Sequence, residues 1–203
     1  MKKTIYLSLV FALVFMFLKT DTNAQKRLEN GTIAPDFKVK DNYDEVIHLY
    51  ESLKEAPVVL IFYRGEWCQY CNLYMHDLAD SLTYITDLGA KIIAVTPESN
   101  RFIDETVHKT NASFSILYDK GHQIMDDYDV TWYVSAFTHF FYKLSGKDLK
   151  KSSKSDERAL PVPATYIIGQ DKKIIDGYFN KDYTKRMPVS DIVKVLEEYN
   201  KKK

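Results

Sequence analysis

Two cysteines separated by two residues, Cys68 and Cys71, follow closely on a continuous apolar run, Val58–Tyr63. A partly β-branched run of this length is typical of a strand that is buried on both faces. After the pair, apolar residues recur at intervals of three and four, as in a helix that packs one face on a core, and Gly89 stands where such a helix commonly ends. These recurring residues are Cys71, Tyr74, Leu78, Leu82 and Ile85. The sequence therefore predicts a buried strand and then a long helix whose first turn holds the cysteine pair.

A Cys-x-x-Cys pair in this position is suited to thiol–disulfide chemistry. Its spacing lets the two sulfurs form a disulfide with each other, and the first turn of a helix supplies unpaired N–H groups and the positive end of the helix dipole. Both favour the thiolate, which is the form that attacks a disulfide. Cys68 is nearer the helix N-terminus, so we expect it to attack, and we expect Cys71 to resolve the mixed disulfide.

Three other roles for the cysteines remain open from the residues alone. One is a structural disulfide, although so short a loop removes little entropy from the unfolded chain. Another is a metal site, which would need two further ligands, and the nearest histidine, His76, lies off the helical face that carries Cys71. The third is a pair of buried free thiols. We favour redox chemistry and expect neither a metal nor a cofactor.

The rest of the chain alternates between predicted strands and helices. Strands are predicted at 91–96, 114–118, 164–168 and 173–178, and helices at 100–110 and from a capping Ser190 onward. Residues 25–57 are polar and turn-rich, and they are expected to form an N-terminal extension, either a hairpin or an irregular lead-in. Gly169–Lys172 joins the last two strands as a hairpin. This order predicts an α/β fold in which helices flank a mixed central sheet.

Residues 130–160 interrupt the alternation and are predicted to be an aromatic helical insertion. The residues at helical spacing are Tyr133, Phe137, Phe140, Phe141 and Leu144. The Lys- and Ser-rich stretch 147–158 that follows is expected to be mobile. Because Trp132–Leu144 holds more aromatic residues than one helix needs for its core face, we expect it to cover part of the active-site end or to form a dimer contact. A helix that simply packs on the sheet is the alternative.

Residues 1–24 have the three-part pattern of a secretory signal peptide. Lys2 and Lys3 precede an apolar run, Ile5–Leu18, and small residues before Gln25 offer a cleavage site. The run is shorter than the roughly 20 residues that span a bilayer, which makes a membrane anchor the weaker alternative. We therefore expect residues 25–203 to form a single redoxin domain that is periplasmic or secreted, with no membrane association after cleavage.

The charge of the chain limits its partners. The 203 residues include 28 Lys and Arg and 28 Asp and Glu, so the formal net charge is zero. Nucleic-acid binding depends on a basic surplus, and we expect none. A hydrophobic content of 45% is typical of a globular protein and excludes disorder as a description of the whole chain.

Three segments of the chain resemble the redoxin group, which includes the alkyl hydroperoxide reductase/thiol-specific antioxidant (AhpC/TSA) proteins and the TlpA/ResA-type periplasmic thioredoxins. Gly31–Phe37, which reads Gly-Thr-Ile-Ala-Pro-Asp-Phe, is similar to the group's opening segment. Phe62–Asn72 resembles the active-site stretch of the peroxiredoxin-like branch, and Val162–Ile168 resembles the proline-led strand of thioredoxins. The motifs occur in the expected order and cover residues 31 to about 200. The resemblance implies a thioredoxin fold.

The resemblance also implies roles for residues around the cysteine pair. Pro163 would be cis and face the pair, and the backbone of Val162 would pair with the chain of a bound partner. Independently of the resemblance, we expect Trp67 to pack against the disulfide and flank the partner groove, with plain core packing as its alternative. We expect Arg64 and Glu66 either to tune the thiolate or to pair with each other at the surface.

The chain departs from the peroxiredoxin pattern Pro-x-x-x-Thr-x-x-Cys. Arg64 replaces the proline and Cys68 the threonine, while Cys71 occupies the position of the peroxide-reactive cysteine. The family's later arginine is absent at its expected place, and Arg158 is out of register. Glu98 is expected to be a solvated loop acid, with proton relay to Cys71 as the alternative.

These departures favour exchange with protein thiols and disulfides, or with a thioredoxin-like reductant, over peroxide chemistry. A thiol-dependent peroxidase that reduces hydroperoxides is the first alternative. A redox-inactive binding module with a structural disulfide is the second.

Overall fold

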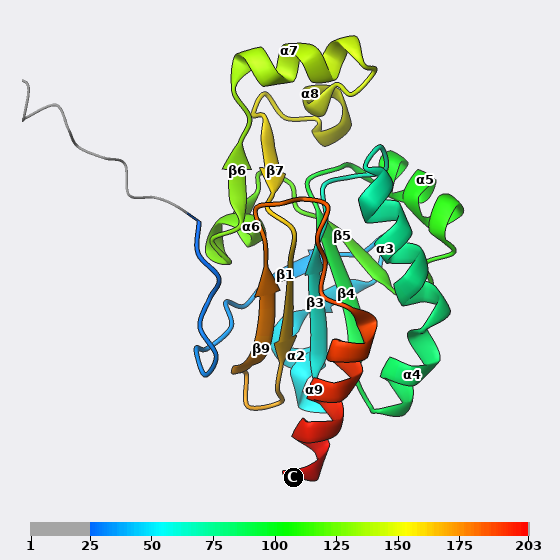
Figure 1. Cartoon of the computed structure of the whole chain (residues 1–203), viewed down its shortest axis with the longest axis vertical. Coiled ribbons are helices and arrows are strands. Elements are labelled where there is room, and N and C mark those ends of the chain that lie inside the picture. Colours follow the sequence, from blue (N-terminus) through cyan, green and yellow to red (C-terminus); the bar gives the residue numbers. More distant parts are fainter. Residues whose placement is uncertain (1–24, 203) are drawn as a thin grey trace, which may run out of the picture.

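Residues 25–202 are described by a computed structural model of the chain (Figure 1). The signal peptide predicted for residues 1–24 lies outside the described residues. The centre is a five-stranded sheet in the order β5-β4-β3-β8-β9. Its strands are β3 (Val58–Phe62), β4 (Lys91–Thr96), β5 (Ser115–Tyr118), β8 (Ala164–Ile168) and β9 (Ile174–Phe179). Neighbouring strands are parallel from β3 to β5 and antiparallel from β3 to β9, which confirms the predicted mixed sheet.

Strand β3 is central, and all five of its residues are buried because helices cover both faces of the sheet. Its Val59 and Ile61 belong to a core shared with α3 (Gln69–Asp80), α4 (Leu82–Asp87), α5 (Asn100–Thr110) and α9 (Val189–Lys201). The alternate residues Val58, Leu60 and Phe62 pack on the other side with α2 (Leu49–Glu55) and α6 (Gln123–Asp127). A continuous apolar run was therefore the correct sign of a strand with two buried faces.

Several predicted boundaries change in the structure. The long helix after the cysteines is divided at Ser81 into α3 and α4, and Gly89, at φ 76°, follows the end of α4. Ser190 is not the cap of the last helix, because α9 begins at Val189 and Pro188 holds the N-cap position, with φ −58° and ψ 142°. The extension 25–57 contains a hairpin of β1 (Lys38–Lys40) and β2 (Val46–His48), and also α2, which the sequence pattern did not predict.

The insertion forms a separate unit beyond the end of the central sheet (Figure 1). It is a two-stranded antiparallel hairpin of β6 (Thr131–Tyr133) and β7 (Ala159–Pro161) that carries α7 (Ala136–Leu144) and α8 (Leu149–Ser153). Val134, Leu149 and Leu160 form a small core inside it. We call residues 131–161 the cap.

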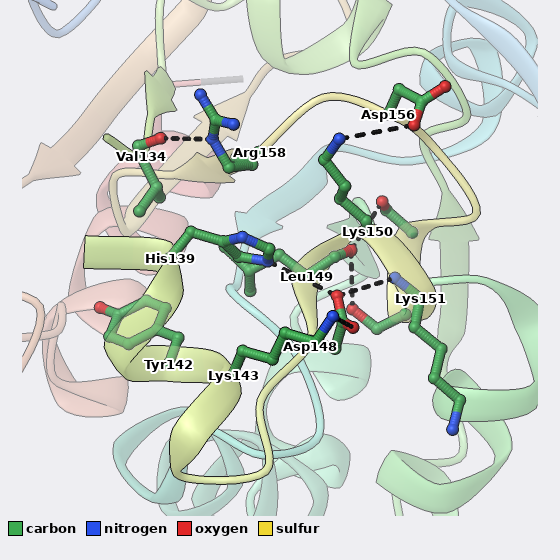
Figure 2. Close-up of polar contacts among 12 residues, drawn as sticks. Val134, His139, Tyr142, Lys143, Asp148, Leu149, Lys150, Lys151, Asp156 and Arg158 are labelled. Carbon is green, nitrogen blue, oxygen red and sulfur yellow. Dashed lines mark hydrogen bonds and ion pairs between the residues drawn. The ribbon is translucent and has the colours of Figure 1, made fainter. Parts of the chain in front are cut away.

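The stretch 147–158, which is expected to be mobile, contains a short helix. This helix is α8, whose N-cap Asp148 accepts a hydrogen bond from the Lys151 N–H at 3.4 Å and pairs with Lys143 at 3.4 Å (Figure 2). The end of α8 is buried against the main domain, where the Ser152 C=O accepts a hydrogen bond from the Ser99 N–H at 2.9 Å. Part of this stretch is thus a short helix with a local N-cap and buried serines.

Between residues 25 and 202, the structure contains no helix long and apolar enough to cross a membrane.

Candidate active site

The cysteine pair lies where the sequence pattern predicts it, between the carboxyl end of β3 and the start of α3. Cys68 is the N-cap residue of α3, and its sulfur accepts a hydrogen bond from the Cys71 N–H at 3.3 Å. The two cysteines form a disulfide with Cα atoms 5.2 Å apart. The Cys68 sulfur therefore accepts a hydrogen bond from one of the N–H groups that have no partner within the helix. This contact favours negative charge on that sulfur once the disulfide is reduced.

The two cysteines differ in their surroundings. Cys68 is 4% exposed, whereas Cys71 is fully buried in the core beside Tyr74 and Leu78. Arg186, from the loop between β9 and α9, places Nη2 3.3 Å from the Cys71 sulfur. Burial lowers the pKa of Arg186 to about 10, so its guanidinium is still charged at neutral pH. Each sulfur thus has its own electropositive neighbour.

Arg186 is a site residue that the sequence did not reveal. It lies 115 residues from Cys71 in a polar loop, and no local pattern links the two. The Nη1 of Arg186 is held by the backbone carbonyls of Tyr183 and Lys185, so its position depends on the folded loop rather than on a spacing motif.

Arg64 does not pair with Glu66, which was one of the two roles considered for it. Its side chain is 4% exposed, and its Nη2 donates to the Tyr142 hydroxyl at 2.7 Å. The guanidinium carbon lies 4.9 Å from the ring centre of Trp67 and 4.4 Å from that of Tyr183. Glu66 forms an ion pair with Lys109 instead. The cation is therefore held by aromatic rings.

Trp67 packs against the core that contains both cysteines, and it also contacts the small core of the cap. Its ring centre is 5.7 Å from that of Tyr142 on α7. The sequence signal for this contact is the surplus of aromatic residues in the insertion. Tyr142 is one of them, and it joins the cap to Trp67 at the active-site end of the sheet. Beside the cysteine pair, the ring centres of Tyr70 and Tyr183 lie 5.9 Å apart.

Glu98 is a buried acid rather than the solvated loop acid expected. It is 1% exposed, and its Oε2 accepts the Glu66 N–H at 2.7 Å, which holds the loop that leads to Cys68. Gly65 has a φ of 147°, and a Cβ at this position would lie 2.4 Å from the Glu98 carboxyl carbon, so only glycine fits. Burial raises the pKa of Glu98 to about 7.

The expectation of a cis Pro163 is wrong, since the described residues contain no cis peptide bond. The chain passes from β7 into β8 through Val162 and Pro163 alone, and the Val162 N–H donates to the Val130 C=O at 2.8 Å. This continues the extended pairing of the cap hairpin, in which trans peptide bonds fit. The Val162 N–H is therefore already bonded within the chain and is not free to pair with a partner.

Metal ligands are not assembled here: within residues 25–202 no group of three or more His, Cys, Asp or Glu could hold a metal ion.

Similarity to known proteins agrees with this geometry. The chain is 26% identical over 187 residues to the thiol-disulfide oxidoreductase ResA of Oceanobacillus iheyensis, covering 89% of this chain and 82% of that protein. It is 31% identical over 103 residues to peroxiredoxin Bcp of Bacillus subtilis, covering 51% of this chain and 65% of that protein.

Solved structures share the fold at low sequence identity. The peroxidoxin BcpB of Mycobacterium tuberculosis superimposes with a TM-score of 0.66 at 15% identity over 85% of this chain and 98% of that chain. A cysteine-to-serine mutant of peroxiredoxin 6 of Arenicola marina gives a TM-score of 0.69 at 14% identity over 85% of this chain and 74% of that chain. These likenesses confirm the predicted thioredoxin fold. Residues 30–176 match the AhpC/TSA family, and the chain belongs to that family.

Proposed function

We propose that this oxidoreductase exchanges dithiols and disulfides through Cys68 and Cys71. The observation that carries the proposal is the position of the disulfide at the N-terminus of α3, where the Cys68 sulfur accepts a hydrogen bond from the Cys71 N–H. A structural bridge has no need of this position, whereas an attacking thiolate is stabilised by it. The relative named as a thiol-disulfide oxidoreductase covers most of the chain, which supports the same activity.

The reaction begins with the reduced pair. The Cys68 thiolate attacks one sulfur of a partner disulfide, forms a mixed disulfide and releases the other partner sulfur as a thiolate. The Cys71 thiolate then attacks the Cys68 sulfur, which releases the second partner thiolate and forms the Cys68–Cys71 disulfide. Two electrons pass from the pair to the partner. Arg186, beside the Cys71 sulfur, favours the thiolate that this second step requires.

In this proposal the partner chain lies along Trp67 and the segment Val162–Pro163 at the active-site end of the sheet. Arg64 and Glu66 support the active site from beside the cysteine pair. Because the Val162 N–H is bonded to Val130, that residue can offer a partner only its C=O. Protein thiols and disulfides, or a thioredoxin-like reductant, are the partners proposed.

Single cysteine variants test the division of labour. Cys71→Ser should accumulate mixed disulfides through Cys68, because nothing resolves them, while Cys68→Ser should trap few partners because Cys71 is fully buried. The adducts are counted by non-reducing gels and mass spectrometry, with the double serine variant as control. Equal trapping by the two single variants would contradict the assignment.

A peroxidase is the second candidate, and the contact between Arg186 and Cys71 is the observation that favours it. In that reaction the Cys71 thiolate attacks the hydroperoxide, giving a sulfenic acid and an alcohol. Cys68 then attacks Cys71, forming the disulfide and water. Stopped-flow oxidation of Cys68→Ser decides between the candidates. Rapid sulfenic acid formation at Cys71, slowed about tenfold by Arg186→Gln, would establish the peroxidase. Slow formation that Arg186→Gln leaves unchanged would exclude it.

Glu98 should make the stability of the folded protein depend on pH. Its folded-state pKa, about 7, is above its ordinary value of 4.5, and burial is the main cause. Between these values the folded protein keeps a proton that the unfolded chain has lost. The contribution of Glu98 to the free energy of unfolding is therefore fully present below about pH 4.5. It is lost as the pH rises through about 7, and the loss is at most about 3 kcal/mol.

Glu98→Gln should remove this slope, because the amide stays neutral and its oxygen can still accept the Glu66 N–H. Urea unfolding of the oxidised protein at pH 5 and pH 8 measures the effect. The wild type should lose more free energy of unfolding over this range than Glu98→Gln, while Glu197→Gln, which alters an exposed acid on α9, should behave as the wild type. If Glu98→Gln keeps the full slope, another group is responsible.

We also propose that residues 1–24 are a signal peptide and that residues 25–203 are the exported redoxin domain. The apolar run behind Lys2 and Lys3 supports this. N-terminal sequencing of protein from the cell envelope should find Gln25 as the first residue, and recovery of Met1 on a membrane-bound form would refute cleavage.

A further inference from the structure

A cavity of about 300 Å³ lies where β7 passes into β8, next to the active-site loop. One part of its wall is apolar and is formed by Trp132 and the segment Pro161–Pro163. Two cations, Arg64 and Lys181, line it as well. Its size is at the small end of the range of ligand-binding pockets, and it joins an apolar surface to positive charge.

Arg64 is the unusual member of this wall. It is more than nine-tenths buried, yet within residues 25–202 its hydrogen-bond partner is the Tyr142 hydroxyl rather than an acid, and its Nε has no partner. Its charge also opposes that of Arg186, which is one of the causes that lower the pKa of Arg186. A buried cation without an anion is costly, so an anionic ligand would stabilise this arrangement.

The chemistry of the wall restricts the ligand. The rings of Trp67, Tyr142 and Tyr183 hold the guanidinium in place, with its carbon 4.4 to 5.9 Å from their centres. A fixed guanidinium presents parallel N–H groups that match a carboxylate. Beside it, the indole of Trp132, which is 39% exposed, offers a flat apolar surface.

We infer that this cavity binds an organic carboxylate with an aromatic or apolar body. The carboxylate pairs with Arg64, Lys181 adds charge at the exposed side, and the body packs on Trp132 and Pro161–Pro163. A neutral ligand would leave Arg64 unpaired, and a small inorganic anion would leave the apolar wall in contact with water. Trp67, which contacts Arg64, also packs against the core that contains the cysteine pair. This inference rests on the cavity alone and does not require the proposed redox activity.

Direct binding to the oxidised protein tests the inference. Phenylacetate is the probe and phenylacetamide, which has the same shape without the charge, is the matched ligand, both followed by calorimetry at constant ionic strength. The chain has two tryptophans, Trp67 and Trp132, and both lie at Arg64 or the cavity, so intrinsic fluorescence gives a second readout. Phenylacetate should bind at least tenfold more tightly than phenylacetamide.

Three variants separate the cavity from general charge effects. Arg64→Gln should abolish the preference for the acid over the amide, and Lys181→Gln, at an exposed position that cannot disturb the core, should weaken phenylacetate severalfold. Arg101→Gln, which removes an exposed arginine on α5, should change nothing.

Four outcomes would each overturn the inference. The first is equal binding of acid and amide to the wild type, and the second is no detectable binding at about 10 mM phenylacetate. The third is tighter binding of inorganic phosphate than of phenylacetate. The fourth is an unchanged phenylacetate affinity in both Arg64→Gln and Lys181→Gln.

Discussion

The hydrogen bond from the Cys71 N–H to the Cys68 sulfur joins the backbone of α3 to the chemistry of the site. It exists because the carboxyl end of β3, the central strand of a sheet that is buried on both faces, leads into the N-terminus of α3. The short connection is held in place by Glu98, whose carboxylate accepts the Glu66 N–H and leaves room at position 65 for glycine alone. A disulfide in this position faces the positive end of a helix, which is the physical basis of its proposed reactivity.

Around this centre the charges come from distant parts of the chain. Arg186 reaches Cys71 from the loop before α9, and the cap supplies Tyr142 to hold Arg64. Within residues 25–202 neither arginine forms an ion pair with a carboxylate, although the charge of Asp182 acts on Arg186. The active-site end therefore contains buried positive charge although the whole chain is formally neutral. Local charge of this kind favours thiolates and anionic ligands, whereas net charge describes only the surface as a whole.

The features that the sequence predicted correctly are local ones. The apolar run of β3, the position of the Cys68–Cys71 pair and the periodicity of α3 follow from neighbouring residues, whose spacing is set by strand and helix geometry. Residues that act through long-range contacts were not predictable in the same way. Arg186 has no spacing relation to Cys71. Glu98 precedes Ser99, whose N–H is bonded to Ser152 of α8, a helix whose Lys- and Ser-rich sequence indicated a loop. The error at Pro163 has a different origin, because the cis bond was an expectation taken from the thioredoxin pattern. In this chain the cap hairpin leads directly into β8, and pairing of Val162 with Val130 keeps the segment extended.

The reduction potential of the Cys68–Cys71 pair tests most directly the claim that this disulfide is a working redox centre. Alkylation in graded thiol–disulfide buffers, read by intact mass, gives the potential of the native protein. We expect a value between about −270 and −120 mV, the range of thioredoxin-like exchangers. A pair that stays oxidised in buffers below about −300 mV would be a structural bridge and would contradict the claim.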